Sequence, residues 1–107
     1  MKIAFDIDGT LYKISEDRKS QVPDYDLIQV LRWFAANGDD VYVWSGGGTD
    51  YAQLIVDRLG LTEIVKCIPK LKLGDDTPVM DCTFDDEIIK NGKANIRVKR
   101  PDYNEKK

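Results

Sequence analysis

The chain has 107 residues, enough for one compact domain (residues 1–107) and too few for two. No apolar run approaches the ~20 residues of a membrane-spanning helix, and the net charge of −3 argues against a nucleic-acid surface along the whole chain. The sequence contains no histidine, which excludes imidazole as a metal ligand or general base. We therefore expect a soluble protein whose chemistry uses carboxylates, lysine and hydroxyl groups.

The N-terminus and the cysteines indicate the compartment. The first residues are strand-like and lack the features of a secretory signal, so we expect a cytoplasmic location. Cys67 and Cys82 form no CxxC pair, which favours free, buried thiols over a zinc site or a disulfide.

The first half of the chain predicts a strand, a polar segment and a helix. Residues 2–6 form a short apolar run typical of a strand, and residues 13–21 predict a loop or small hairpin before Pro23. A helix is expected next, with Asn37-Gly38 as its left-handed exit. Its apolar positions recur at helical spacing: Leu27, Ile28, Leu31, Phe34 and Ala35.

The second half continues the alternation. Residues 41–44 are a continuous apolar run typical of a strand buried on both faces. Thr49 is the expected N-cap of a second helix, which Gly60 ends. Three further strands are expected at residues 64–68, 79–84 and 94–98.

Strands that alternate with helices imply right-handed crossovers and an open sheet. We therefore expect an α/β fold: a three-layer, Rossmann-like domain with a mostly parallel central sheet of about five strands. The strand at residues 94–98 is expected at an edge. Trp33 and Trp44 are expected to belong to the core.

Polar or glycine residues follow three of these strands directly. They are Asp6 and Asp8 after the first strand, Ser45, Gly46 and Gly47 after the second, and Asp85 and Asp86 after the fourth. Ligands of parallel sheets bind beyond the C-terminal ends of the strands, so we expect these residues to converge at one edge. Four carboxylates at one point repel each other unless a hard cation neutralises them, and oxygen ligands select Mg²⁺.

The pair Asp6 and Asp8 could divide the work of phosphoryl transfer. Asp6 could attack phosphorus to give an aspartyl phosphate, while Asp8 could protonate the leaving oxygen and later deprotonate water. The hydroxyl of Ser45 and the backbone N–H groups of Gly46 and Gly47 could bind the phosphoryl oxygens.

A lysine is expected to neutralise the same oxygens, because this chemistry depends mainly on positioning and electrostatics. Lys70 precedes the fourth strand, Lys72 follows two residues later, and Lys66 lies in the third strand. We prefer Lys70, and the other two stay as alternatives.

With these residues in this order, the chain resembles the haloacid dehalogenase-like hydrolases, chiefly the small capless phosphatases of bacteria and phages. The resemblance covers nearly the whole chain and rests on the run Asp6-Ile7-Asp8-Gly9-Thr10 together with the serine, lysine and acidic pair that follow. It implies a Mg²⁺-dependent phosphomonoester hydrolase that forms an aspartyl phosphate.

The resemblance also implies a role for each matching residue. Asp6 would be the nucleophile and a Mg²⁺ ligand, and Asp8 the general acid and base, binding the metal through its backbone carbonyl. Ser45 would bind phosphate and Lys70 would stabilise it. The acidic metal ligand would be Asp85 or Asp86, an alternative that stays open.

Caps of this family are inserted between the first and second motifs or between the second and third. Here a loop and a helix fill the first gap, and a helix and a strand fill the second. We therefore expect no cap domain and an open site. An open site accepts a phosphorylated macromolecule as readily as a free metabolite. Closure of the site by an oligomer partner is a further alternative, and the oligomeric state stays open. Nucleic acid is expected only as a substrate.

The competing hypothesis is a non-catalytic phosphate-binding, metal-binding or regulatory domain on the same scaffold.

Overall fold

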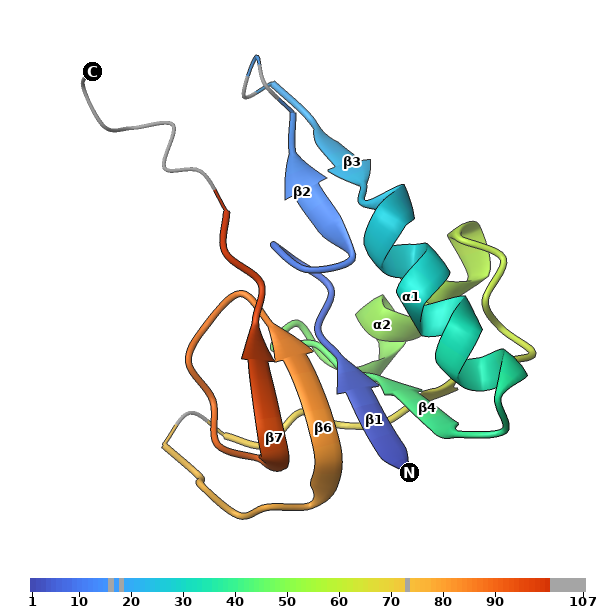
Figure 1. The fold of residues 1–107 in the computed structure, drawn as a ribbon. Coiled ribbons are helices and arrows are strands. Elements are labelled where there is room, and N and C mark those ends of the chain that lie inside the picture. The colour runs from blue at the N-terminus through green and yellow to red at the C-terminus, as the bar shows by residue number, and fades with distance from the viewer. Residues whose placement is uncertain (16, 18, 73, 101–107) are drawn as a thin grey trace.

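A five-stranded parallel sheet forms the centre of the computed structural model, which describes residues 1–15, 17, 19–72 and 74–100. The strand order is β5-β4-β1-β6-β7, and every neighbouring pair is parallel (Figure 1). The strands are β1 (Lys2–Phe5), β4 (Asp40–Val43), β5 (Lys66–Cys67), β6 (Met80–Asp85) and β7 (Gly92–Arg97). This confirms the predicted α/β, Rossmann-like fold, with β7 at an edge.

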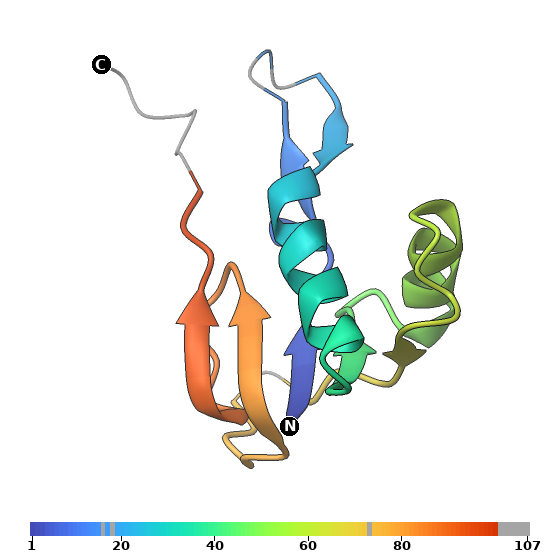
Figure 2. The same cartoon turned by 45° about the vertical axis from the view of Figure 1, so that its right-hand side comes forward.

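Two helices cover one face of the sheet. Helix α1 (Tyr25–Ala36) connects the hairpin that follows β1 to β4, and α2 (Thr49–Arg58) connects β4 to β5 (Figure 2). Their buried side chains share one hydrophobic cluster with strand residues of a single face: Ile28, Leu31, Ala52, Ile55 and Val56 with Ile3, Phe5, Val41, Val43 and Phe84. The strand members alternate along the chain, as residues on one face of a sheet must.

Irregular chain covers the opposite face. Of the described residues between β5 and β6, none is helical. A second, smaller cluster lies on this face and consists of Ala4, Trp44 and Met80, with Tyr42, Ile68 and Ile89 packed against them. The third layer of the domain is therefore built from the segments that flank β6 instead of from a helix.

The ends of the helices differ in how well the sequence predicted them. Helix α1 begins after Asp24, whose carboxylate accepts a hydrogen bond from the N–H of Leu27 over 3.1 Å, and it ends at Asn37-Gly38 as expected. The predicted N-cap of α2 is wrong, because Thr49 is already helical. Gly48 precedes it with a φ of +100° and turns the chain into the helix one residue earlier.

Two further predictions need correction. The strand expected at residues 64–68 is reduced to β5, because the N–H groups of Ile64 and Val65 donate to Leu61 in a turn. Trp33 is 61% exposed, whereas Trp44 is fully buried as predicted. Trp33 lies two residues from the buried Leu31, about 200° around the helix, and so falls outside the apolar stripe.

A hairpin lies beyond the C-terminal end of β1. It consists of the antiparallel strands β2 (Tyr12–Ile14) and β3 (Gln21–Pro23), as the sequence allowed (Figure 1). The described elements between β1 and β4 are this hairpin and α1, and those between β4 and β6 are α2 and β5, so neither gap holds a cap domain. Neither helix in the described ranges is long and apolar enough to cross a membrane.

Candidate functional site

The strand ends bring the predicted residues together. Phe5 of β1 pairs with Val43 of β4 on one side and with Phe84 of β6 on the other. The N–H of Asp6 continues this pairing by donating to the carbonyl of Phe84 over 3.0 Å. The residues that follow β1, β4 and β6 therefore lie side by side at the C-terminal edge, as expected from a parallel sheet.

Three carboxylates gather at this edge. One oxygen from each of Asp6, Asp85 and Asp86 lies within 4.8 Å of the others. Asp6 is 5% exposed and Asp85 only 1%. Oδ2 of Asp85 is buried and lies 2.7 Å from Nζ of Lys70. Three closely spaced carboxylate oxygens are the kind of ligands that a hard cation such as Mg²⁺ takes.

Lys70 is the lysine that reaches the carboxylates. Its Nζ donates a hydrogen bond to Oδ1 of Asp6 over 3.0 Å and lies 2.7 Å from Oδ2 of Asp85. At 2.7 Å this second contact is a close ion pair, so one ammonium group compensates both carboxylates. Lys66 and Lys72, the two alternatives, have exposed side chains.

The crowding of these groups changes their proton affinity. Burial, followed by the charge of Asp85, raises the pKa of Asp6 to about 7 against the opposing effect of Lys70. Burial is also the first cause of a raised pKa at Asp86. Burial alone would lower the pKa of Lys70, but its contacts with Asp85 and Asp6 outweigh burial and raise it. Near neutral pH Asp6 therefore changes between its protonated and its ionised form.

Asp8 lies apart from this cluster. Its side chain is exposed, and Oδ1 accepts a hydrogen bond of 2.7 Å from the hydroxyl of Tyr51 in the first turn of α2. Among the described residues, three of the four predicted carboxylates therefore gather at the site, whereas Asp8 pairs with Tyr51. Sequence reasoning missed Tyr51, although its place one turn after the glycine run was visible.

Ser45 follows β4 and is 4% exposed. Its Oγ accepts a hydrogen bond of 3.0 Å from the N–H of Gly47. The N–H of Gly47 is predicted to bind a phosphoryl oxygen. It can do so only after its hydrogen bond to Ser45 breaks.

The turn after Asp8 is held from two sides. Gly9 has a φ of +80°, and a Cβ on it would clash with the carboxylate of Asp86, so another residue there would be strained and would displace Asp86. Arg100, which the sequence did not connect with this turn, donates from Nε to the carbonyl of Gly9 over 2.8 Å and from Nη2 to that of Thr10 over 2.6 Å. Its Nη1 pairs with Asp24 over 2.8 Å.

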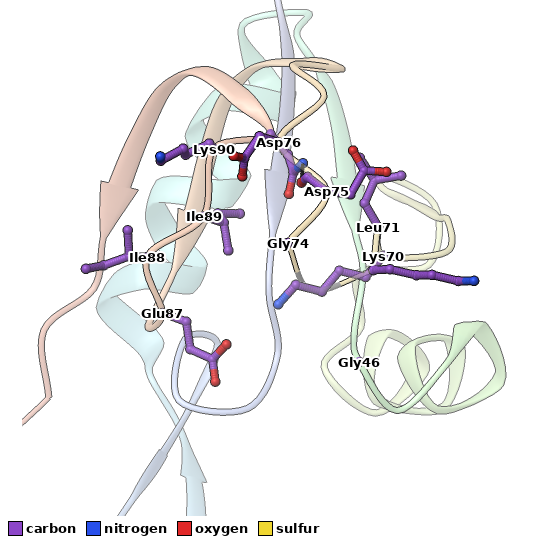
Figure 3. Close-up of a pocket in the computed structure, with 12 residues that line it drawn as sticks. Gly46, Lys70, Leu71, Gly74, Asp75, Asp76, Glu87, Ile88, Ile89 and Lys90 are labelled. Carbon is purple, nitrogen blue, oxygen red and sulfur yellow. Dashed lines mark hydrogen bonds between the residues drawn. The ribbon is translucent and has the colours of Figure 1, made fainter.

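A cavity of about 220 Å³ adjoins this edge on the face without helices. Figure 3 shows the chain segment that carries Lys70 and Leu71 on one side and the segment that carries Glu87, Ile88 and Ile89 on the other. Lys72 and Gly46 also line it, which places two predicted site residues and one alternative lysine at its wall.

Asp81, an acidic residue that could begin a spaced motif, lies away from the site. Its Oδ2 accepts a hydrogen bond from the N–H of Lys2 over 2.8 Å, at the N-terminal edge of the sheet. The acidic pair at the candidate site is therefore Asp85 and Asp86. The basic residues near the C-terminus are the one local candidate for a nucleic-acid patch that the sequence offers, and two of them, Lys106 and Lys107, lie outside the described residues.

No family model matches the chain, and no curated protein or solved structure matches it either.

Proposed function

We propose that the protein is a Mg²⁺-dependent phosphomonoester hydrolase of the haloacid dehalogenase-like type, with an open site. The observation that carries the proposal is the cluster of Asp6, Asp85 and Asp86, in which three carboxylate oxygens lie close together and Lys70 supplies one positive charge. Three carboxylates beside one ammonium group leave excess negative charge, which is costly to bury. A purely structural ion pair would need only one carboxylate for the ammonium group.

The donor set suits the metal. Carboxylate oxygens of Asp6, Asp85 and Asp86 would hold Mg²⁺, with the backbone carbonyl of Asp8 as the further ligand that the family resemblance implies. When bound, Mg²⁺ supplies positive charge to the carboxylates and to the phosphoryl oxygens.

The residues then have distinct tasks. A carboxylate oxygen of Asp6 attacks phosphorus, and the bond between phosphorus and the ester oxygen breaks as Asp8 gives that oxygen a proton. Asp8 then takes a proton from water, whose oxygen attacks phosphorus and releases Asp6 and inorganic phosphate. Lys70 and Ser45 stabilise the negative charge of the phosphoryl oxygens.

Hydrolysis of p-nitrophenyl phosphate tests the proposal. We expect turnover that requires Mg²⁺ and is abolished in Asp6→Asn, whereas Asp81→Asn, on the same sheet but at its opposite edge, keeps wild-type turnover. Absence of both turnover and Mg²⁺-dependent binding of beryllofluoride would overturn the proposal. Binding of beryllofluoride without turnover would instead support the non-catalytic alternative.

The substrate in this proposal is a phosphorylated small molecule or macromolecule in the cytoplasm. A screen of phospho-metabolites and of oligonucleotides phosphorylated at the 3′ or 5′ end separates these classes. An oligonucleotide should then bind only when it carries a terminal phosphate.

A further inference from the structure

We infer that Tyr51 is the positioning residue of the acid and base Asp8, an inference that rests on the proposed function. The hydroxyl of Tyr51 donates a hydrogen bond of 2.7 Å to Oδ1 of Asp8. The two residues are 43 positions apart and belong to different elements, α2 and the turn after β1. The contact therefore depends on how the helix docks on the sheet.

The ring of Tyr51 is held in place on two sides. It packs against the main hydrophobic cluster under α2. On its other side lies the glycine turn, where a Cβ on Gly47 would be 3.1 Å from Cδ2 of the ring and 3.4 Å from Oγ of Ser45. This fit leaves no room for a side chain at position 47 unless the ring moves. The hydroxyl is consequently directed by the same turn that carries the phosphate-binding serine.

Tyr51 also stays a donor at neutral pH. Burial, and then the hydrogen bond to Asp8, raises the pKa of Tyr51 to about 12. A raised pKa favours the protonated hydroxyl, which is the form that donates to Asp8.

The contact gives Asp8 a defined orientation. An exposed aspartate carboxylate can adopt several rotamers, and only some direct an oxygen at the substrate. With Oδ1 held by Tyr51, Oδ2 remains to carry the proton that moves to the leaving oxygen as the ester bond breaks. Oδ2 then receives the proton of the attacking water. Correct placement of a proton donor contributes directly to rate, so its loss should slow reactions that need the proton.

The dependence of kcat/KM on the leaving group is the test, because this parameter reports steps up to the loss of the alcohol. An alkyl phosphate needs protonation of its leaving oxygen, whereas 2,4-dinitrophenyl phosphate expels a stable anion. We expect Tyr51→Phe to lower kcat/KM about tenfold for the alkyl ester and little for the dinitrophenyl ester, in line with the loss of one hydrogen bond to a charged group. In the Asp8→Asn background the same change should have almost no further effect.

Tyr25→Phe is the matched control, since Tyr25 is 70% exposed on α1, and it should leave both esters unchanged. A melting temperature of Tyr51→Phe near that of the wild type excludes a folding defect. An equal loss for both esters, no loss at all, or an undiminished effect in Asp8→Asn would overturn the role of Tyr51 while the proposed function stands. A wild-type protein that hydrolyses neither ester would overturn both.

Discussion

Replacement of Lys70 by methionine tests how the three carboxylates coexist at the edge of the sheet. Methionine keeps most of the aliphatic length and removes the ammonium group, which lies 3.0 Å from Asp6 and 2.7 Å from Asp85. All three side chains are largely buried, with exposed fractions of 16%, 7% and 1% for Lys70, Asp6 and Asp85. Solvent therefore screens the interaction poorly.

The expected cost follows from the charges left behind. Removal of one partner of a buried ion pair typically destabilises a protein by about 3–5 kcal/mol, because the remaining charge is buried without compensation. Asp6 has a pKa of about 7 and can take up a proton to relieve part of this cost. We therefore expect about 3 kcal/mol for the metal-free protein at pH 8, a loss of roughly 10–20 °C in melting temperature. At pH 5 Asp6 is already protonated, and the loss should be smaller.

Thermal unfolding followed by circular dichroism at pH 5 and pH 8, in EDTA and in Mg²⁺, measures these differences. Mg²⁺ should restore much of the stability at pH 8, because the cation replaces the missing positive charge. Lys72→Met, two residues along and exposed, should melt like the wild type throughout. An equal loss at both pH values, or a loss in Lys72→Met as large as in Lys70→Met, would refute the reasoning.

Three further results are expected. Gly9→Ala should lose about 1–2 kcal/mol and bind Mg²⁺ more weakly, because its Cβ enters a left-handed conformation and displaces Asp86; thermal melts and Mg²⁺ titration measure both effects. Mg²⁺ should raise the melting temperature more at pH 8 than at pH 6, since below a pKa of about 7 a proton on Asp6 competes with the metal. Arg100→Ala should lose about 2 kcal/mol in a denaturant titration, because it gives up two hydrogen bonds and an ion pair.

The sign of the pH effect comes from the difference between folded and unfolded chains. The pKa of Asp6 is raised from 3.8 to about 7, so between these values the folded protein binds more protons than the unfolded one. The contribution of Asp6 to metal-free stability therefore falls as pH rises through this range. Equal Mg²⁺ shifts at pH 6 and pH 8 would contradict this account.

The other two predictions have their own controls. Gly38 has a φ of +85° but no atom near its Cβ position, so Gly38→Ala should cost stability without weakening Mg²⁺ binding. Lys99 is exposed beside Arg100, and Lys99→Ala should unfold like the wild type. Wild-type stability of Arg100→Ala would show that its contacts with the turn do not hold the fold.

The sequence by itself determined the order of elements and the edge at which the candidate site lies. Apolar runs at residues 2–6, 41–44 and 79–84 correspond to β1, β4 and β6 within a residue or two, because buried strands are marked by composition as well as by period. Polar residues at the ends of parallel strands must then share an edge. Asp6, Ser45 and Asp85 could therefore be placed there without coordinates.

Tertiary structure alone decided which side chains touch. The sequence favoured Lys70 but left Lys72 and Lys66 as alternatives. Only the course of the irregular chain before β6 brings Lys70 to Asp6 and Asp85. The same holds for Tyr51, which reaches Asp8 because α2 docks on the face that β1 and β4 share. Contacts between segments tens of residues apart depend on packing and on the path of irregular chain. Periodicity and composition report burial, and they carry no information about which of several exposed or half-buried side chains turns towards a given neighbour.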